Sequence, residues 1–177
     1  ECWALGTNTL RVAQNASDFL IASQAQGIQI KVISGIQEAM LIYAGVCLNL
    51  PKNGRLRLAA DIGGGSTEVV LGRDDQRIIA ESIEVGSVSW RDKFFLDLRS
   101  EIEANKQIDL AVSSAINEFS KISVVLKEKG WAEAYASSGT VKMLMNISNG
   151  NGFGSGTISL NFLLGLRLAI IKSSLYG

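Results

Sequence analysis

The 177-residue chain contains no histidine, two cysteines and one proline. Without histidine, Ser-His-Asp and Cys-His catalysis are excluded, and so is a zinc site built from histidine and cysteine. Cys2 and Cys47 stand far apart and form no CxxC motif, which fits a reducing interior, so we expect both to be core thiols. Carboxylates, hydroxyls, backbone amides and a hard metal ion remain as chemical tools.

The chain also lacks an excess of either charge, because 17 basic residues balance 17 acidic ones. No global field is therefore available to hold a nucleic acid or an anionic membrane, and an anionic ligand must be held by local geometry. No apolar run reaches the roughly 18 residues of a membrane span, and the opening residues lack the basic start of a signal peptide. We expect a cytoplasmic protein, and a first residue other than Met suggests that the chain begins inside a longer gene product.

Hydrophobic periodicity predicts alternating helices and strands in an α/β protein. We expect Glu38 in the first turn of a helix, and an antiparallel set of strands folded around a run of glycines. The last helix is apolar enough to need a partner surface. The predicted helices cover residues 9–26, 37–47, 90–98, 101–129, 141–147 and 160–175; the strands cover 28–33, 55–62, 68–71, 77–85 and 132–136, and a flexible loop covers 148–156.

The sharpest local feature is the segment Asp61-Ile62-Gly63-Gly64-Gly65-Ser66-Thr67-Glu68, between two predicted strands. Consecutive glycines let backbone amides approach an oxyanion without obstruction by Cβ, and the two hydroxyls can add donors. The flanking carboxylates would repel a bare phosphate, which makes sense if a cation such as Mg²⁺ lies between them. The sequence therefore predicts a phosphate cradle with Asp61 as the metal ligand; the plainer alternative is a tight turn with surface acids.

Two commoner glycine motifs do not fit this segment. A P-loop would end in Lys-Ser/Thr and open a helix, and a dinucleotide fingerprint would read G-x-G-x-x-G before a helix. A strand, glycine loop and second strand are instead similar to the phosphate loops of the actin and hexokinase superfamily.

Five collinear motifs between Gly6 and Thr140 resemble the exopolyphosphatase/guanosine pentaphosphate phosphatase family. The resemblance implies an actin-like, ribonuclease H-like fold with a mixed sheet flanked by helices. It also implies Mg²⁺-dependent hydrolysis of the terminal phosphoanhydride of polyphosphate, or of pppGpp to ppGpp. The motifs are Gly6–Phe19 (in part), Ile33–Val46 (in part), Asp61–Glu68, Gly86–Val88 and Ala136–Thr140.

The resemblance also assigns roles to individual residues. Glu38 matches the glutamate that positions or deprotonates the attacking water, although Gln37 replaces the acid that often precedes it in the family. Asp61 matches the metal-associated aspartate and Glu68 a second functional glutamate. The matched phosphate-binding residues are Gly63, Gly64, Gly65, Ser66 and Thr67, with Ser138, Gly139 and Thr140 in a later glycine loop.

Some family features have no counterpart in this chain, including a first strand–loop phosphate motif. The resemblance therefore implies a partial protein: residues 1–48 as the tail of a first lobe and residues 49–177 as a truncated second lobe. Because the cleft of this superfamily lies between lobes, we expect little activity from the chain alone, and the full-length protein could form a homodimer. Arg11, Arg91 and Lys142 could contact a polyanion, but we favour solvated surface positions for all three.

Two other kinds of function stay open. A regulatory module could bind polyphosphate or (p)ppGpp without hydrolysis, and it would keep the glycine loops while Glu38 had no function. An actin-like kinase or assembly protein would bind ATP and would need an adenosine pocket around Ser138–Thr140.

Overall fold

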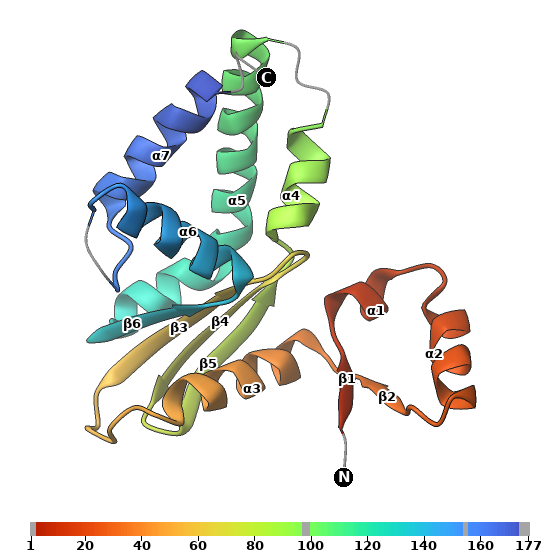
Figure 1. Ribbon diagram of the computed structural model, residues 1–177. Helices are drawn as coiled ribbons and strands as arrows, with labels where there is room; N and C mark the ends of the chain where they lie inside the picture. Colours follow the sequence, from red (N-terminus) through yellow and green to blue (C-terminus); the bar gives the residue numbers. More distant parts are fainter. Residues whose placement is uncertain (1–2, 97–99, 154–155, 174–177) are drawn as a thin grey trace.

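The computed structural model describes residues 3–96, 100–153 and 156–173, which form two sheets with flanking helices (Figure 1). The smaller sheet pairs β1 (Ala4–Gly6) in parallel with β2 (Ile30–Val32), and α1 (Asn8–Val12) and α2 (Ala16–Ala25) connect them. The larger sheet has the order β5-β4-β3-β6, in which β3 is antiparallel to β4 and parallel to β6. Its strands are β3 (Leu56–Ile62), β4 (Thr67–Arg73), β5 (Gln76–Ile83) and β6 (Glu133–Ser137). The predicted α/β class with a mixed sheet is confirmed.

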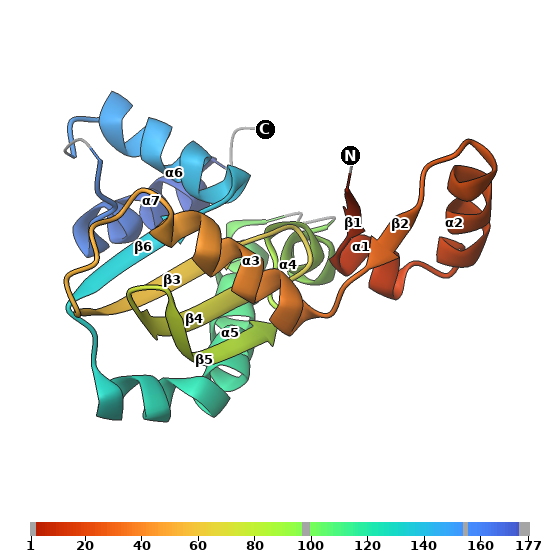
Figure 2. The ribbon, with the colours of Figure 1, turned by 90° about the horizontal axis from the view of Figure 1, so that it is seen from below.

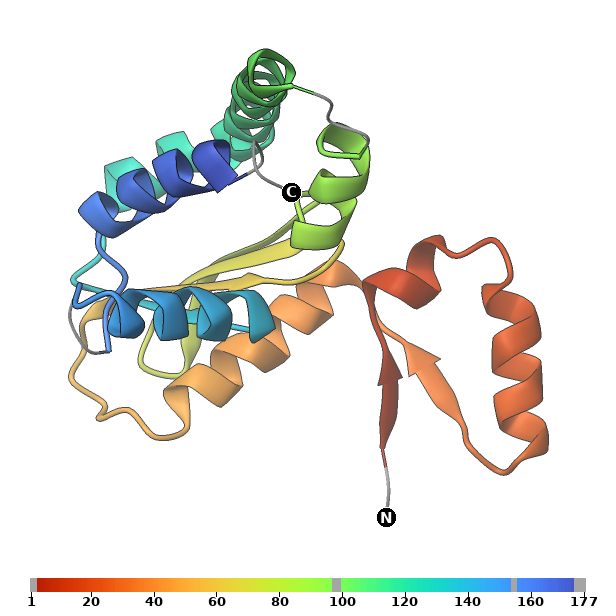
Figure 3. The ribbon, with the colours of Figure 1, turned by 45° about the horizontal axis from the view of Figure 1, so that its top comes forward.

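Helices cover both faces of the larger sheet (Figure 3). On one face, α3 (Gly35–Cys47) packs Ala39 and Tyr43 against Ala59 and Val70. On the other, α5 (Glu101–Lys129) packs against β4 and β5, with α4 (Ser87–Phe94) and α7 (Leu160–Ser173) beside it. The helix α6 (Gly139–Gly150) follows β6 and contacts β3 and β6. Because β4 is covered on both faces, its residues from Thr67 to Gly72 are all buried.

A capping box fixes the start of α3. The hydroxyl of Ser34 accepts a hydrogen bond from the Gln37 amide at 3.2 Å, and the Gln37 side chain accepts one from the Ser34 amide at 3.0 Å. The helix therefore begins at Gly35, and Glu38 lies in its first turn as predicted. Gln37 is thus used to hold the end of the helix.

The N-terminal region differs most from its prediction. The expected helix over residues 9–26 is two helices, because Ala13 has an extended backbone with φ −68° and ψ 130° that ends α1. The strand β1 was not predicted, and three residues are too few for a visible alternation.

The other elements keep their predicted type and shift mainly at their ends. The long helix α5 has the predicted bounds and stops before Gly130, whose φ of 63° suits glycine. The helix α4 begins at Ser87, earlier than expected, and α6 continues to Gly150 into the predicted loop. Parts of three predictions lie outside the described residues: positions 97–98, 154–155 and 174–175.

The helix α3 lies across the strands of the larger sheet, which Figure 2 shows from below. It precedes residue 48, so the segment predicted as the tail of a first lobe contributes a covering helix to the second sheet; the lobe division itself stays a prediction. In the described part of the chain, no helix is both long and apolar enough to cross a membrane.

Candidate phosphate site

One row of polar side chains crosses the larger sheet at the ends of β3 and β6. Asp61 pairs with Glu68 on β4 and with Ser137 on β6, and Glu68 pairs with Ser82 on β5. Directly paired residues point to the same face, so the order across the sheet is Ser82, Glu68, Asp61, Ser137. We call these four residues the polar row. It faces α3, because Ala59 and Val70, two residues along the same strands, pack against that helix.

Glu68 is the most deeply buried acid of the polar row, with 2% of its surface exposed. Burial raises the pKa of Glu68 above its ordinary value of 4.5, and the charges of Glu38 and Asp61 raise it further. Hydrogen bonds from Ser82 and Ser66 act in the opposite direction and lower this pKa. Ser82 Oγ donates to Glu68 Oε1 at 2.7 Å. Glu38 and Asp61 therefore lie close enough to Glu68 to disfavour its charged form.

Glu38 reaches this group from the first turn of α3 and is paired with Arg11. Arg11 Nη1 donates to Glu38 Oε2 at 3.0 Å and to the carbonyl of Ile33 at 2.9 Å. Both charged side chains are largely buried, at 21% and 19% exposure. The prediction that Arg11 lies on a solvated face is wrong, because α1 turns its guanidinium into the site.

The glycine loop beside the polar row is held from one side by the N-terminus of α4. The Ser87 amide donates to the Gly63 carbonyl, and the amides of Val88 and Ser89 donate to the Gly64 carbonyl, each at 2.9 Å. Among the described residues, the Gly64 and Gly65 amides donate to no protein acceptor. The loop thus has its carbonyls satisfied and two donors unused, which suits an anion.

Close packing explains why this loop needs glycine. A Cβ at Gly86 would lie 2.4 Å from the carbonyl carbon and oxygen of Gly64, so α4 can approach the loop only without a side chain there. A Cβ at Gly65 would lie 2.0 Å from Asn8 Oδ1, so α1 contacts the other side of the loop. Sequence reasoning did not single out Asn8, and only the fold brings it to residue 65.

The two hydroxyl residues after the glycines are buried and have different surroundings. Thr67 Oγ1 donates to the Val85 carbonyl at 2.5 Å, which fixes the start of β4 against the end of β5. The hydroxyl of Ser66 stabilises the charged form of Glu68, as its effect on that pKa shows. Whether either contacts phosphate stays a prediction, but the geometry gives Thr67 a backbone partner already.

The second predicted loop lies next to the first. Thr140 Oγ1 and Ser87 Oγ are 3.2 Å apart, which joins the N-terminus of α6 to that of α4. Ser138 has φ 102° and ψ 169°, a conformation that is favourable only for glycine, and its hydroxyl caps α6 by accepting from the Val141 amide. Gly139 follows it and is exposed. The structure therefore brings Ser138–Thr140 and Gly63–Thr67 to one site.

Two basic candidates stay outside the site. Arg91 Nη2 pairs with its neighbour Asp92 at 2.7 Å and is 60% exposed. Lys142 is exposed on α6. Of the three basic residues, only Arg11 approaches the carboxylates.

The donor set suits a hard cation that keeps water or phosphate ligands. Mg²⁺ commonly takes one or two carboxylates and fills its remaining positions with water and substrate oxygens. Asp61 and Glu68 are paired across adjacent strands, and their mutual repulsion would be relieved by a cation. Within the described ranges no three acidic or thiol side chains could enclose a metal on their own. Any ion here would therefore complete its coordination with water or with oxygens of the substrate.

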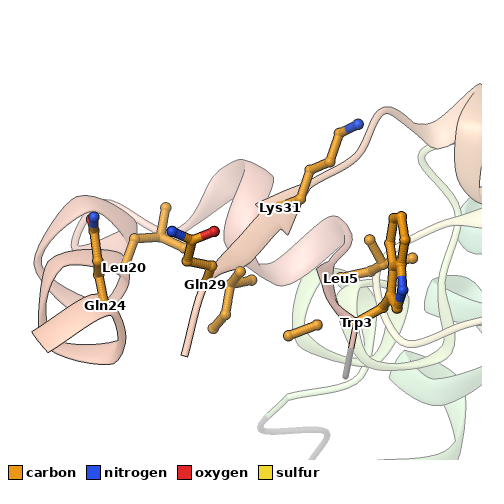
Figure 4. Close-up of a pocket in the computed structure, with 8 residues that line it drawn as sticks. Trp3, Leu5, Leu20, Gln24, Gln29 and Lys31 are labelled. Atoms are coloured by element: carbon orange, nitrogen blue, oxygen red, sulfur yellow. The ribbon is translucent and has the colours of Figure 1, made fainter. Parts of the chain in front are cut away.

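Two hollows border the N-terminal segment. A cavity of about 420 Å³ adjoins the site and is lined by residues including Arg11, Gly35 and Ser82. Another of about 500 Å³ lies between α2, with Leu20 and Gln24, and the opposite wall formed by Trp3 and Leu5 (Figure 4). The first cavity shares Arg11 and Ser82 with the site, whereas no carboxylate lines the second.

Sequence reasoning missed Ser82 and Ser137 in this site. The register of β3 with its neighbours brings them beside Glu68 and Asp61. Ser82 lies inside one predicted strand and Ser137 directly follows another, but strand order was needed to show which residues are neighbours.

The sequence matches the model of a known protein family over almost its whole length. The model of the Ppx/GppA phosphatase family matches residues 1–172. A Haemophilus influenzae protein described as "Putative exopolyphosphatase" is 39% identical over 156 residues, which cover 88% of this chain and 47% of that protein. The chain thus spans about half the length of this curated relative.

Solved structures agree. The Aquifex aeolicus PPX-GPPA enzyme superposes with a TM-score of 0.65 at 25% identity, covering 84% of this chain and 47% of that one. A Cytophaga hutchinsonii exopolyphosphatase structure shares the fold with a TM-score of 0.74 at 22% identity, covering 96% of this chain and 56% of that one. These likenesses confirm the predicted actin-like α/β class, and the chain belongs to the Ppx/GppA phosphatase family.

Proposed function

We propose that the protein containing this chain hydrolyses terminal phosphoanhydride bonds of a polyphosphate-type substrate. The observation that carries the proposal is the convergence of Glu38, Asp61 and Glu68 beside a glycine loop with two unused amides. Carboxylates supply a base and a cation site, and free amides supply anion contacts, as phosphoryl transfer requires. The exopolyphosphatase name of the Haemophilus influenzae relative favours inorganic polyphosphate over pppGpp.

The steps use these residues and an attacking water molecule. The terminal phosphate lies against the Gly64 and Gly65 amides, which neutralise part of its charge. Glu38 Oε2 is held by Arg11, and the carboxylate accepts a proton from the attacking water. The water oxygen forms a bond to the terminal phosphorus as the bridging P–O bond breaks, and the shortened chain leaves with that bond's electron pair.

A cation would lie between Asp61 and Glu68. Held by these two carboxylates, Mg²⁺ would neutralise part of the negative charge of the phosphate groups. The role of this chain is to hold the two carboxylates in register on neighbouring strands, next to the phosphate loop.

Phosphate release from polyphosphate in the presence of Mg²⁺ tests the proposal in the intact protein. We expect turnover with polyphosphate, and Glu38→Gln to lower it by about 10²–10⁴-fold while ligand binding is retained, because general-base catalysis contributes that much. The exposed pair Glu118–Lys121 gives a matched control, Glu118→Gln, which should leave turnover unchanged.

Each competing function has its own outcome in that experiment. Unchanged turnover in Glu38→Gln would remove Glu38 from the reaction, and binding without turnover in the parent protein would indicate a regulatory module. Parallel assays with pppGpp decide between the two substrates. A thermal shift with ATP but not with polyphosphate would favour a nucleotide-binding protein.

A further inference from the structure

Each end of the polar row is a serine that donates a hydrogen bond to the neighbouring carboxylate. Ser82 Oγ donates to Glu68 Oε1 at 2.7 Å, and Ser137 Oγ donates to Asp61 Oδ2. We propose that Ser82 and Ser137 are positioning residues that hold the Glu68 and Asp61 carboxylates turned toward one another as a two-carboxylate cation site. The inference rests on the proposed function for its setting, but it concerns binding of the ion alone.

The arrangement is directional. In the order of the strands, the serines occupy the two outer positions and the carboxylates the two inner ones. A hydroxyl has one proton to donate, so each serine engages one carboxylate oxygen from the outside of the pair. Hydrogen bonds of this kind fix the orientation of a metal-binding side chain, and their loss typically lowers the affinity for the metal.

The fold gives Ser82 little freedom to turn away. A Cβ at Gly35, the first residue of α3, would lie 2.3 Å from both Cβ and Oγ of Ser82. The N-terminus of α3 therefore covers this serine closely. The capping box that sets where α3 begins thus also limits the rotamers of Ser82.

Ser137 is held by the backbone that follows it. It is the last residue of β6, paired with Asp61, and the next residue is Ser138 with its positive φ. The chain leaves the sheet at once, so the pairing with Asp61 is the last in this strand. Packing by α3 thus holds the Ser82 hydroxyl, and the end of β6 holds the Ser137 hydroxyl. The two hydroxyls lie on opposite sides of the pair of carboxylates.

A purely structural explanation makes a different prediction. If the serines only satisfied two buried acids, their loss would lower stability and leave the cation affinity of the folded protein unchanged. The proposal predicts instead that the affinity falls, since the carboxylates could then rotate apart under their own repulsion.

Mn²⁺ binding measured by electron paramagnetic resonance of the free ion, without substrate, tests this in the intact protein. We expect Ser82→Ala and Ser137→Ala each to weaken Mn²⁺ binding by about 10–100-fold, as is typical when a partner of a metal ligand is lost. Ser137→Thr keeps the hydroxyl and should retain most of the affinity. Ser113→Ala is the matched control, because Ser113 donates to the Asp109 carbonyl at 2.7 Å on the exposed side of α5.

The result is decisive in either direction. Affinities of the folded alanine variants within about threefold of the parent overturn the proposal, and so does a parent protein that binds no Mn²⁺ at millimolar concentration. If Ser82→Ala does not fold, Ser137→Ala tests the same claim from the other end of the polar row. A parent that binds Mn²⁺ but releases no phosphate would contradict the proposed function and leave this inference standing.

Discussion

The α3 face of the larger sheet carries buried charged groups at two places. One is an ion pair of opposite charges, and the other is a group of neighbouring acids. At one end, Arg57 is 1% exposed and is bound by Glu133 at 2.9 Å, with further acceptors from Pro51 and Asn53. At the other, the polar row brings Glu68 and Asp61 together with Glu38 near them, and Arg11 pairs with Glu38. We call the first group the arginine cluster.

The pKa of the acid is shifted in opposite directions in the two regions. The hydrogen bond from Arg57 holds the pKa of Glu133 below its ordinary value, whereas burial and neighbouring acids raise the pKa of Glu68. In the arginine cluster, the charge of Arg57 is balanced by Glu133. In the polar row, the adjacent carboxylates Glu68 and Asp61 would be balanced by a bound cation. The difference marks the site without reference to any relative.

The largest expected effect breaks the arginine cluster. Glu133→Gln leaves the Arg57 guanidinium buried beside a neutral partner, so we expect a loss of several degrees in Tm by calorimetry. Turnover per folded molecule should not change, because the cluster lies far from the glycine loop along β3. Lower turnover with an unchanged Tm would reverse the assignment of the two regions.

A smaller effect is expected where the glycine loop meets α4. Gly86→Ala places a Cβ 2.4 Å from the Gly64 backbone and should destabilise the protein by about 1–3 kcal/mol in urea unfolding. Phosphate binding should weaken as well, since the loop must move.

Gly45→Ala is the matched control for that loop. Gly45 lies inside α3 with nothing within 4 Å of an added Cβ, so alanine there should stabilise the protein by about 0.5–1 kcal/mol. If both alanines had the same effect, close packing would not be the reason for glycine at residue 86.

The smallest effect is a pH slope that should have opposite signs in the two regions. The folded pKa of Glu68 lies above 4.5, so between 4.5 and that raised value the folded state holds a proton that the unfolded chain has released. The free energy of unfolding should therefore fall as pH rises through this interval, and Glu68→Gln should remove that contribution. Urea midpoints across acidic pH measure it.

Glu133 supplies the opposite slope for comparison. Its folded pKa is lowered, so its contribution is present above its unfolded pKa and is lost as pH falls toward the folded value. Glu133→Gln should flatten that acidic loss. Equal signs for the two variants would mean that the acids do not differ in the way the structure indicates.

Local signals predicted the elements of the fold well. The glycines, the alternation in the strands and the long apolar stripe of α5 gave element types along most of the chain, and Glu38 lies in its predicted helical turn. The prediction of one N-terminal helix was wrong because no glycine or proline marks the break at Ala13. Its consequence is large, since α1 is the element that carries Arg11 to Glu38, 27 residues away.

The sequence did not predict which residues become neighbours across paired strands. Asp61, Glu68 and the glycines could be chosen from a single segment, but Ser82 and Ser137 become neighbours only through the order β5-β4-β3-β6. Asn8 likewise meets Gly65 because α1 folds back onto the loop. The sequence identified chemically suitable residues in one segment, but the strand order and the path of α1 decide which of them are in contact.

The attachment of α4 to the glycine loop also gives the protein an optical reporter. Trp90 follows the loop-binding residues Ser87–Ser89 on the same helix, and its indole nitrogen donates to the Ala111 carbonyl at 3.2 Å. Trp3 and Trp131 are more exposed, at 77% and 44%. Emission from the half-buried Trp90 should therefore lie at shorter wavelength than theirs, and a movement of the loop when an anion binds would change its colour and intensity without any added dye.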